Sequence, residues 1–396
     1  MNKTILEPSN QIPVIDECDV AVIGGGIGGI SAALAAARNG AKTYLVDKEI
    51  CLGGLATMGL VVVYLPLDDG KGNQLTGGIG EELIRNSLKY GPGKIPDCWN
   101  PGGDPGERKK KRFRAMYNAA SFMISVEELL VDAGVKISYD CRFSNVHKEG
   151  AKIDAVILES KEGRIALGCK AVVDATGDAD VCVAAGEETV AYRRNIRTAW
   201  FYSYDGADLK LHQLTDEMYN ITDEQPLYEG VRQSDIFRFN YDGRQMIMDK
   251  VREMNKTSES PVYPAIIPSY SEFLMTRRLR SKFELGYSQQ RTVFEDSIGM
   301  CNYWLKKGHL YYIPLSALTA KHTGNLITAG RCISVDDKLW DVTRVIPVCA
   351  VTGEAAGTAS AMAAAENLSF HDLDVGRLKD TLRGQGAIID PSLKDA

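Results

Sequence analysis

The sequence predicts an α/β fold built on a parallel sheet, and two observations predict it. Short apolar runs at residues 18–23, 43–46 and 171–174 are rich in β-branched side chains, as in strands that are buried on both faces of a parallel sheet. Between the first two runs, the Ala-rich segment 27–39 ends just before Gly40 and predicts a helix. A strand, a helix and a second strand in this order form a β-α-β unit.

Composition limits the possible classes of protein. With 396 residues, 44% hydrophobic and 25% charged, the chain is typical of a globular protein of roughly two to three domains. A net charge of −6 argues against non-specific binding to nucleic acid. No apolar run approaches the ~20 residues of a membrane span, and the first residues do not read as a signal peptide. We therefore expect a cytoplasmic protein without nucleic-acid or membrane partners.

The cysteines do not form a recognisable site. The chain has nine of them, scattered and never spaced C-x-x-C. This argues against a metal knuckle, an iron–sulfur cluster or a redox disulfide. We expect no metal site.

A glycine motif joins the first predicted strand to the helix. Gly24, Gly26 and Gly29 form G-x-G-x-x-G, and Asp47 ends the second strand 18 positions beyond Gly29. The first glycine permits a tight turn, the second lets a pyrophosphate approach the backbone, and the third lets helix and strand pack closely. The acidic side chain accepts hydrogen bonds from an adenosine ribose. The unit therefore predicts a dinucleotide whose pyrophosphate lies at the helix N-terminus.

Further glycine-marked segments follow other predicted strands. Gly53 and Gly54 come soon after the second strand, where backbone passing close to a ligand is expected. The strand at 171–174 runs into the sequence ATGDAD, and a strand at 325–329 ends at Gly330 and Arg331.

Together these motifs resemble a known family. The ordered set GGGIGG, LVDK, LGGLAT, VVDATGDAD, NLITAGRCIS and RVIPVCAVTGEAAGTASA resembles the FAD-dependent oxidoreductases of the glutathione-reductase-like superfamily, in the branch with ATGDAD and AGRCIS. The resemblance implies a Rossmann-like FAD-binding domain with a parallel sheet and an inserted α+β cap for the substrate. We expect the FAD-binding domain in residues 1–190 and 311–375, the cap in 191–310, and a polar tail in 376–396.

The resemblance also implies which residues contact FAD. Besides the three motif glycines, the expected contacts are Ile27, Gly28, Asp47, Lys48, Gly53, Gly54, Ala56, Thr57, Ala175, Thr176, Gly177, Gly330, Arg331, Arg344 and Val345. Phe143 matches the position whose backbone meets the adenine. No His or Cys in these stretches is placed for covalent attachment, so FAD is expected to be held non-covalently.

The last motif predicts the flavin end of the site. Pro347 is suited to the first turn of a helix, and the small residues at 348–365 favour helix. In the resembling family this helix points its N-terminus at the flavin, where its dipole would stabilise negative charge on the reduced ring. Arg344 would add a full positive charge there, unless it serves only as a surface ion-pair partner.

Two features of disulfide reductases in this superfamily are missing. Ala56 to Gly59 occupy the place of their C-x-x-x-x-C pair, and no second strand, G-x-G-x-x-G and helix is found for NADPH. Electrons are therefore expected from the substrate or from another, unidentified donor or acceptor. Several relatives also carry a histidine where this chain has Asp337.

Three side chains in the predicted cap, or just after it where the chain returns to the FAD domain, are candidates for catalysis. Arg278, in the motif MTRRL, is expected either to bind an anionic or hydroxyl-rich substrate or only to pin the cap to the FAD domain, and Arg277 shares both interpretations. His309 and Tyr312 are the candidates for proton transfer, although a lone histidine is more often structural.

Together, the predicted cofactor and the candidate catalytic residues lead to a predicted reaction. We expect hydride transfer between flavin N5 and a small polar substrate that bears a hydroxyl or amine, possibly sugar-like. Reduction of an activated C=C bond is the enzymatic alternative, and structural FAD in a binding or RNA-modification protein is the non-redox alternative. The sequence leaves the oligomeric state open.

Overall fold

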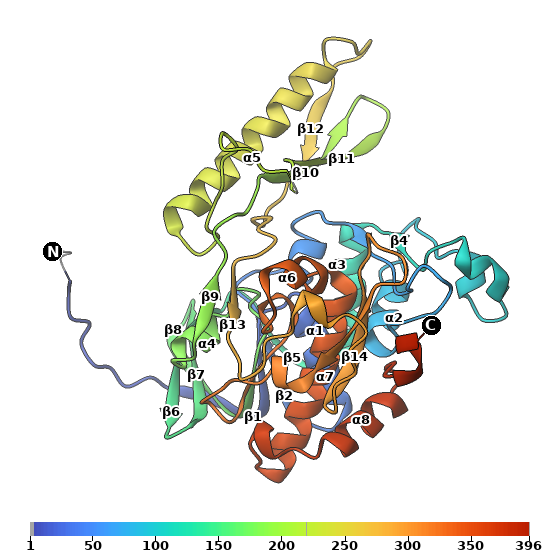
Figure 1. The fold of residues 1–396 in the computed structure, drawn as a ribbon. Coiled ribbons are helices and arrows are strands. Elements are labelled where there is room, and N and C mark those ends of the chain that lie inside the picture. The colour runs from blue at the N-terminus through green and yellow to red at the C-terminus, as the bar shows by residue number, and fades with distance from the viewer. Residues whose placement is uncertain (1–3, 219, 396) are drawn as a thin grey trace.

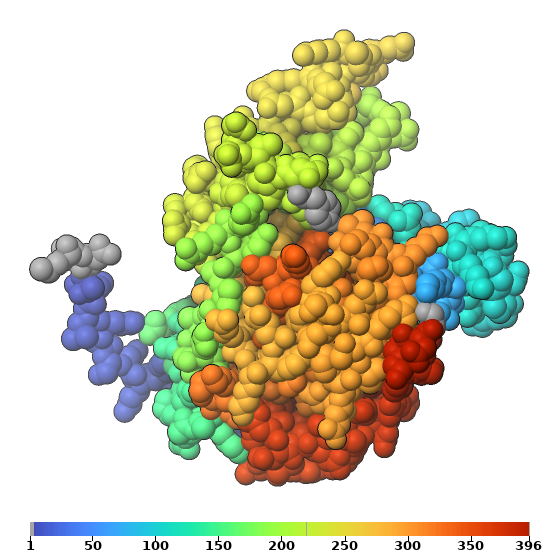
Figure 2. Space-filling model, viewed as in Figure 1, coloured from blue at the N-terminus to red at the C-terminus, as the bar shows by residue number. Residues whose placement is uncertain are grey.

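The computed structural model describes residues 4–218 and 220–395 and consists of a large body that carries a smaller cap. Figure 1 shows the cap, drawn in green and yellow, projecting from the body on two connecting segments, and in the space-filling view of Figure 2 the cap rests on the body. The body contains the residues before 190 and those after about 277, so segments far apart in the sequence form one unit.

The body is organised around a seven-stranded sheet with the order β5-β2-β1-β8-β7-β6, and β16 pairs with β8 beside this path. The strands are β1 (Val14–Ile23), β2 (Thr43–Val46), β5 (Lys136–Ser138), β6 (Arg142–Glu149), β7 (Lys152–Ser160), β8 (Gly163–Asp174) and β16 (Leu326–Thr328). The β5-β2-β1-β8-β16 part is parallel, whereas β6, β7 and β8 are antiparallel. This confirms the predicted α/β fold with a parallel-rich, Rossmann-like sheet.

The predicted β-α-β unit is present. Helix α1 (Ile27–Arg38) joins β1 to β2 and ends at Asn39, and Gly40 follows with φ +85°, in the left-handed region that favours glycine. The helix therefore ends within one residue of the predicted position.

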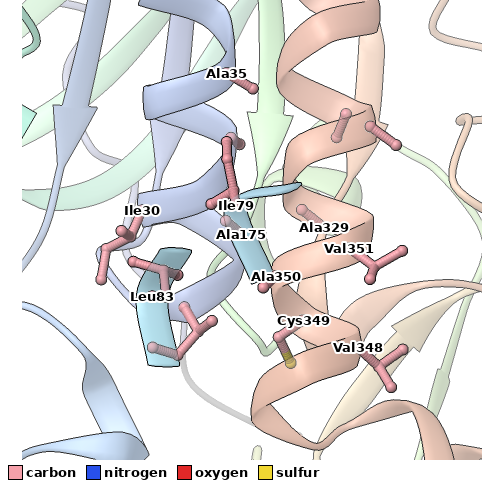
Figure 3. Close-up of a cluster of buried hydrophobic side chains, with 14 of the residues drawn as sticks. Ile30, Ala35, Ile79, Leu83, Ala175, Ala329, Val348, Cys349, Ala350 and Val351 are labelled. Carbon is pink, nitrogen blue, oxygen red and sulfur yellow. The ribbon is translucent and has the colours of Figure 1, made fainter. Parts of the chain in front are cut away.

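Helix α7 (Ile346–Glu366) packs along α1 at unusually short range. A β-carbon added at Gly353 would lie 2.3 Å from the Gly28 carbonyl oxygen, and one at Gly357 would lie 2.1 Å from the Ala32 carbonyl oxygen. The two glycines therefore do not break the helix but let the two backbones approach. Figure 3 shows α1 and α7 side by side, with Ile79 and Leu83 of α2 (Gly78–Asn86) beside them.

The remaining body elements cover the sheet. Helix α3 (Ala119–Asp132) joins α1 and α2 in the main core, and the short pair β3 (Val63–Tyr64) and β4 (Ala115–Met116) lies near it. The opposite face of the sheet has its own core, to which α4 (Asp180–Ala184) contributes Val181 and Cys182. Helix α6 (Asp337–Thr343) leads into α7.

The cap has a separate architecture. Strands β10 (Thr198–Tyr204), β11 (Leu209–Thr215) and β12 (Tyr263–Ile266) form an antiparallel sheet in the order β11-β10-β12, and the long helix α5 (Gln233–Met254) packs on it. Two small cores, one around Phe201 and Ile247 and one around Phe239 and Phe273, hold it together. At its base, β9 (Thr189–Ala191) pairs with β13 (Arg277–Leu279).

The end of the cap differs from the predicted boundary at 310. Strand β14 (Ser297–Asn302) pairs with β15 (Leu310–Pro314), and this hairpin packs on α7 and α8 (Val375–Gly384) in the body. The inserted unit thus ends where β13 begins, because the chain from there on returns to the FAD-domain sheet and helices.

The predicted polar tail is wrong in its first part. Residues 375–384 form α8, whose Leu378 and Leu382 are fully buried in the main core, and Ile389 is buried after it. Leucines four residues apart lie on one helical face, so this segment is amphipathic rather than merely polar. Among the described residues no single helix is long and apolar enough to cross a membrane; only the bent pair α6 and α7, taken together, reaches that length and composition.

Candidate cofactor site

A cavity opens at the carboxyl edge of the parallel strands and encloses about 1000 Å³ when the space open to solvent is included. Ile23 of β1 pairs with Val46 of β2 on one side and with Asp174 of β8 on the other, and Asp174 pairs in turn with Thr328 of β16. The loops after these four strands therefore begin side by side. In open α/β sheets, this edge is where ligands bind.

The N-terminus of α1 faces the cavity without a side-chain cap. Gly26 occupies the N-cap position with extended backbone (φ −71°, ψ 179°), and no side chain accepts a hydrogen bond from the first turn. The free amides and the helix dipole there favour an anion. A β-carbon added at Gly26 would meet no atom within 4 Å, so this glycine leaves open space at the helix end.

The other two motif glycines are required by packing. Gly24 has φ +107°, and a β-carbon there would lie 2.4 Å from the Ala175 carbonyl oxygen. Gly29 does not line the cavity: its β-carbon would lie 1.8 Å from the Gly24 carbonyl oxygen, inside the turn. The tight turn at Gly24 and the close packing at Gly29 are thus present, and of the three motif glycines only Gly24 and Gly26 line the cavity.

Asp47 is held at the end of β2 by backbone amides. Its carboxylate accepts hydrogen bonds from the N–H of Gly25 and from the N–H of Glu49, the latter at 2.7 Å. Burial nevertheless raises the pKa of Asp47 above its usual value. Lys48 and Phe143 also line this part of the cavity, so the residues expected at the adenosine end lie together.

The second glycine loop lines the cavity, but Thr57 does not. Gly53 and Gly54 both have positive φ, of 102° and 54°. The hydroxyl of Thr57 is buried and donates to the Leu52 carbonyl oxygen at 2.6 Å. Thr57 therefore stabilises the loop and does not line the cavity, so the prediction that it contacts the cofactor is wrong. Ala56 does line the cavity.

Ala175, Thr176 and Gly177 line the cavity beside Gly330 and Arg331. Gly177 has φ +74°, and a β-carbon there would lie 2.5 Å from Nη2 of Arg331, so the arginine lies directly over this loop.

The N-terminus of α7 also contributes to the cavity. Arg344, Ile346 and Cys349 line it, whereas Val345 is the N-cap residue and does not. No side chain caps this helix either. The guanidinium of Arg344 donates to Asp341 at 2.5 and 3.0 Å, so Arg344 is both an ion-pair partner and a cavity residue. Burial raises the pKa of the Cys349 thiol to about 12.

Three expected catalytic side chains lie elsewhere. Tyr312 is fully buried and donates its hydroxyl to the Asp390 carbonyl oxygen at 2.8 Å. His309 lies at the turn of the β14–β15 hairpin, with its ring near Tyr303. Neither lines the cavity. The hairpin returns along α7 and α8, so closeness in sequence to the last FAD motif does not bring these residues to the cofactor.

Arg278 also lies outside the cavity. Its guanidinium is buried, forms ion pairs with Glu284 (2.8 Å) and Asp337 (3.2 Å), and lies over the ring of Trp340. Its neighbour Arg277 pairs with Asp180 at 2.6 Å. Of the two interpretations of this motif, the structure favours the one in which the arginines pin the base of the cap.

A strap formed by residues 268–276 leads from the cap back across the cavity. The Ser269 N–H donates to the Met58 carbonyl at 3.0 Å, the Thr276 hydroxyl donates to Gly177 O and Asp178, and Arg331 donates to the Phe273 carbonyl oxygen. These bonds tie the strap to the glycine loops. Between them, Tyr270 lines the cavity, with the Lys48 ammonium 5.2 Å from its ring centre.

Several lining residues were not expected from the sequence. They are Ile23, Val46, Leu55, Met58, Cys141, Arg142, Asp178, Asp180, Tyr270, Ala329, Ile346 and Cys349. Most adjoin a recognised motif, and Asp178 and Asp180 belong to ATGDAD itself. Burial and the neighbouring carboxylates raise the pKa of Asp180 to about 6. Tyr270 lies in no motif and had no signal in the sequence.

These residues fit FAD. Two helix N-termini without side-chain caps contribute residues to one cavity, and the open space beside Gly26 suits a pyrophosphate. The acid at the end of β2 lies where a ribose is bound in dinucleotide folds. The fold and the site thus define a dinucleotide-binding α/β protein.

The chain belongs to the FAD dependent oxidoreductase family, whose model matches residues 19–260 and 276–382. It is an enzyme of that family, and its cofactor is FAD. No curated protein matches the chain.

Solved structures are similar to the chain at low sequence identity. The p-nitrophenol 4-monooxygenase PnpA from Pseudomonas putida DLL-E4 superposes with a TM-score of 0.52 at 11% identity, over 93% of this chain and 84% of that one. A geranylgeranyl bacteriochlorophyll reductase-like protein from Thermoplasma acidophilum gives 0.48 at 14% identity, over 96% and 90%.

Proposed function

We propose that the protein oxidises a small polar substrate at a carbon that bears a hydroxyl or an amine. A separate electron acceptor then reoxidises the flavin. The observation that carries the proposal is the strap: a cap segment with its own side chains crosses the mouth of the FAD cavity and is hydrogen-bonded to three of its loops. Such a segment encloses a small molecule next to the cofactor rather than a macromolecule.

When bound, FAD supplies the acceptor for a hydride and its two electrons. The protein contributes positively charged groups at fixed positions around the FAD. Arg344 and the uncapped N-terminus of α7 place positive charge at the cavity, and this charge would stabilise negative charge on a bound, reduced flavin. The strap limits access of water from the side of the cap.

The ordered motifs support placing the protein in the glutathione-reductase-like superfamily, in the branch with ATGDAD and AGRCIS. The chain nevertheless has Ala56, Thr57 and Met58 where disulfide reductases of that superfamily carry a cysteine pair. We therefore propose a direct exchange with the substrate rather than a thiol relay.

A panel of substrates tests this function. The oxidised protein is mixed anaerobically with polyols, hydroxy acids and amino acids, and the visible flavin absorption band is followed. Bleaching by a member of the panel is the expected result. If no member bleaches the band, and dithionite-reduced protein is instead reoxidised by an enoate, the protein is a C=C reductase and the proposal is wrong. A flavin that no donor reduces would indicate a structural cofactor.

A further inference from the structure

The strap is fastened to both parts of the molecule. It belongs to the connecting segment that runs from β12 in the cap to β13 at the base of the cap (Figure 1). On the cap side, the Phe273 ring stacks on Phe239 with 4.1 Å between the ring centres, and the Glu272 carboxylate accepts the Trp200 N–H at 3.0 Å. On the body side, the strap is hydrogen-bonded to three cofactor loops. It therefore couples the cap to the loops that surround the cavity.

Tyr270 is the strap residue that lines the cofactor cavity. Its ring lies 5.2 Å from the ammonium group of Lys48, which follows Asp47 at the end of β2. Burial raises the pKa of Tyr270, the carboxylates of Asp178 and Asp47 act in the same direction, and Arg331 opposes them. The hydroxyl thus remains protonated and lies among the loops that follow β2, β8 and β16. Because Asp47 marks the ribose position in dinucleotide folds, Tyr270 lies at the adenosine part of the site.

The hydroxyl of Tyr270 has no protein partner. No residue in 4–218 or 220–395 forms a hydrogen bond with it. Other tyrosines of the body do form such bonds: Tyr117 donates to the Ala56 carbonyl oxygen at 2.7 Å, and Tyr64 donates to the Gly80 carbonyl oxygen at 2.8 Å. Tyrosine hydroxyls that are taken out of water normally find an acceptor. The ribose and the pyrophosphate of a dinucleotide supply acceptor oxygens in this part of the cavity.

The strap lies outside the family pattern. The family model matches residues 19–260 and 276–382, so Tyr270 falls between the two matched parts. The glycine loops that predict the FAD contacts lie inside them. A contact between the strap and the cofactor is therefore not one that the family pattern supplies.

We propose that the strap holds the cofactor in place: Tyr270 contacts the adenosine part of bound FAD and donates its hydroxyl to a ribose or pyrophosphate oxygen, and the bonds of the strap to the cofactor loops slow the release of FAD. This role does not depend on which substrate is oxidised. Since Glu272 and Phe273 join the strap to the cap, FAD and the cap stabilise each other's position.

The first experiment measures the rate at which the holoprotein releases FAD. The protein is diluted, and the rise of FAD fluorescence on release is followed with time. Tyr270→Phe keeps the ring and removes the hydroxyl, and it should release FAD about tenfold faster than the wild type. Tyr263→Phe is the matched control, because Tyr263 is 58% exposed on β12 of the same cap. It should release FAD at the wild-type rate.

A second variant tests the fastening of the strap. Thr276→Val removes the hydroxyl that donates to the Gly177 carbonyl oxygen at 2.9 Å and to Asp178 at 2.6 Å, and nearly keeps the shape of the side chain. It should release FAD several times faster than the wild type, although Thr276 does not line the cavity. The control is Thr257→Val, at an exposed position after α5 in the cap. An unchanged rate in Thr276→Val would overturn the role of the strap's bonds.

Calorimetry with two halves of the cofactor locates the contact. ADP and FMN are titrated separately into the full-length protein from which FAD has been removed. Tyr270→Phe should weaken the binding of ADP by about tenfold and leave the binding of FMN unchanged. A variant that weakens FMN binding instead would place the tyrosine at the flavin and overturn the assignment. A purely structural role would weaken both ligands alike and also contradicts it.

The outcomes are separate from those of the proposed function. Wild-type release of FAD and wild-type affinity for ADP in Tyr270→Phe overturn the inference, whichever substrate bleaches the flavin. Faster release in the variant supports it, even if no polyol, hydroxy acid or amino acid reduces the flavin. Thermal unfolding of each variant without FAD shows whether the fold is kept, and Tyr270→Phe and Thr276→Val should unfold close to the wild-type temperature.

Discussion

The Gly29 backbone lies against the Gly24 carbonyl group so closely that a β-carbon on Gly29 would stand 1.8 Å from its oxygen. Gly26, between them in the same motif, would place its β-carbon in open space. One motif therefore contains glycines with two different physical requirements. Gly29 is needed for α1 to pack on β1, and Gly26 is needed only by what binds in the cavity. Two matched substitutions separate these requirements.

Gly26→Val should fold and lose FAD. The backbone at Gly26 is extended, a conformation that valine adopts readily, and its β-carbon meets no atom within 4 Å. Its methyl groups would instead fill the space of the pyrophosphate. Absorption spectra and thermal unfolding of the purified variant should show colourless, folded protein. Gly384→Val, where the β-carbon also meets nothing, is the control and should stay yellow. A yellow Gly26→Val protein would contradict the site.

Gly29→Ala should fail in folding rather than in binding. The added methyl overlaps the Gly24 carbonyl, and backbone on both sides has to move, at a cost of about 3 kcal/mol or more. Urea unfolding of the apoprotein measures this directly. Stability equal to that of the wild type would mean that α1 and β1 do not approach as described.

Arg344 should raise the reduction potential of the bound flavin. Its guanidinium lines the cavity beside the N-terminus of α7 and is partly neutralised by Asp341. Arg344→Gln should lower the potential, by about 20 mV for each 1 kcal/mol of lost stabilisation of the two-electron reduced form. Asp341→Asn should raise it, because the arginine then loses its counter-charge. Potentiometric titration measures both, and shifts of the same sign in the two variants would rule out this electrostatic role.

Glu354 should make stability depend on pH. Its side chain is 2% exposed within α7 and accepts the Ile79 N–H at the start of α2, and burial raises its pKa from 4.5 to about 8. The folded state therefore retains a proton that the unfolded state loses. The stabilisation is complete below about pH 4.5 and is lost as pH rises through about 8.

Glu354→Gln removes this proton linkage and keeps an acceptor for Ile79. The variant should match the wild type near pH 5 and exceed its free energy of unfolding, by an amount on the order of 3 kcal/mol, near pH 9. Denaturant unfolding across this range tests it, with the exposed Glu253→Gln as the control. A constant difference between variant and wild type at all pH values would show that Glu354 does not titrate as described.

The sequence predicted those parts of the candidate site that lie at a turn, a helix end or a strand end with a recognisable local pattern. Gly24, Gly26 and Asp47 are such cases, because a turn, a helix end and a strand end each leave a local pattern that implies the neighbouring contact. Arg331 and Gly330 follow the same rule at the end of β16. Thr57 shows the limit of the approach: it lies in a recognised loop, yet its side chain points to the loop's own backbone.

Long-range packing could not be predicted in the same way. His309 and Tyr312 lie near the last motif in sequence, but the hairpin that carries them faces α7 and α8, and no local pattern reveals which way a hairpin turns. Tyr270 reaches the cavity because the cap folds back over the body. The position of the strap depends on contacts between segments that are separated by more than 70 residues, such as that of Trp200 with Glu272.

The cofactor content of the purified protein is the most direct test of the account. Protein that has been gently purified, and supplied with FAD if colourless, is denatured, and the FAD released into the supernatant is quantified against the polypeptide. We expect one FAD per chain, fully released because no covalent bond holds it. Protein that carries no FAD and takes none up when it is supplied would contradict the central claim.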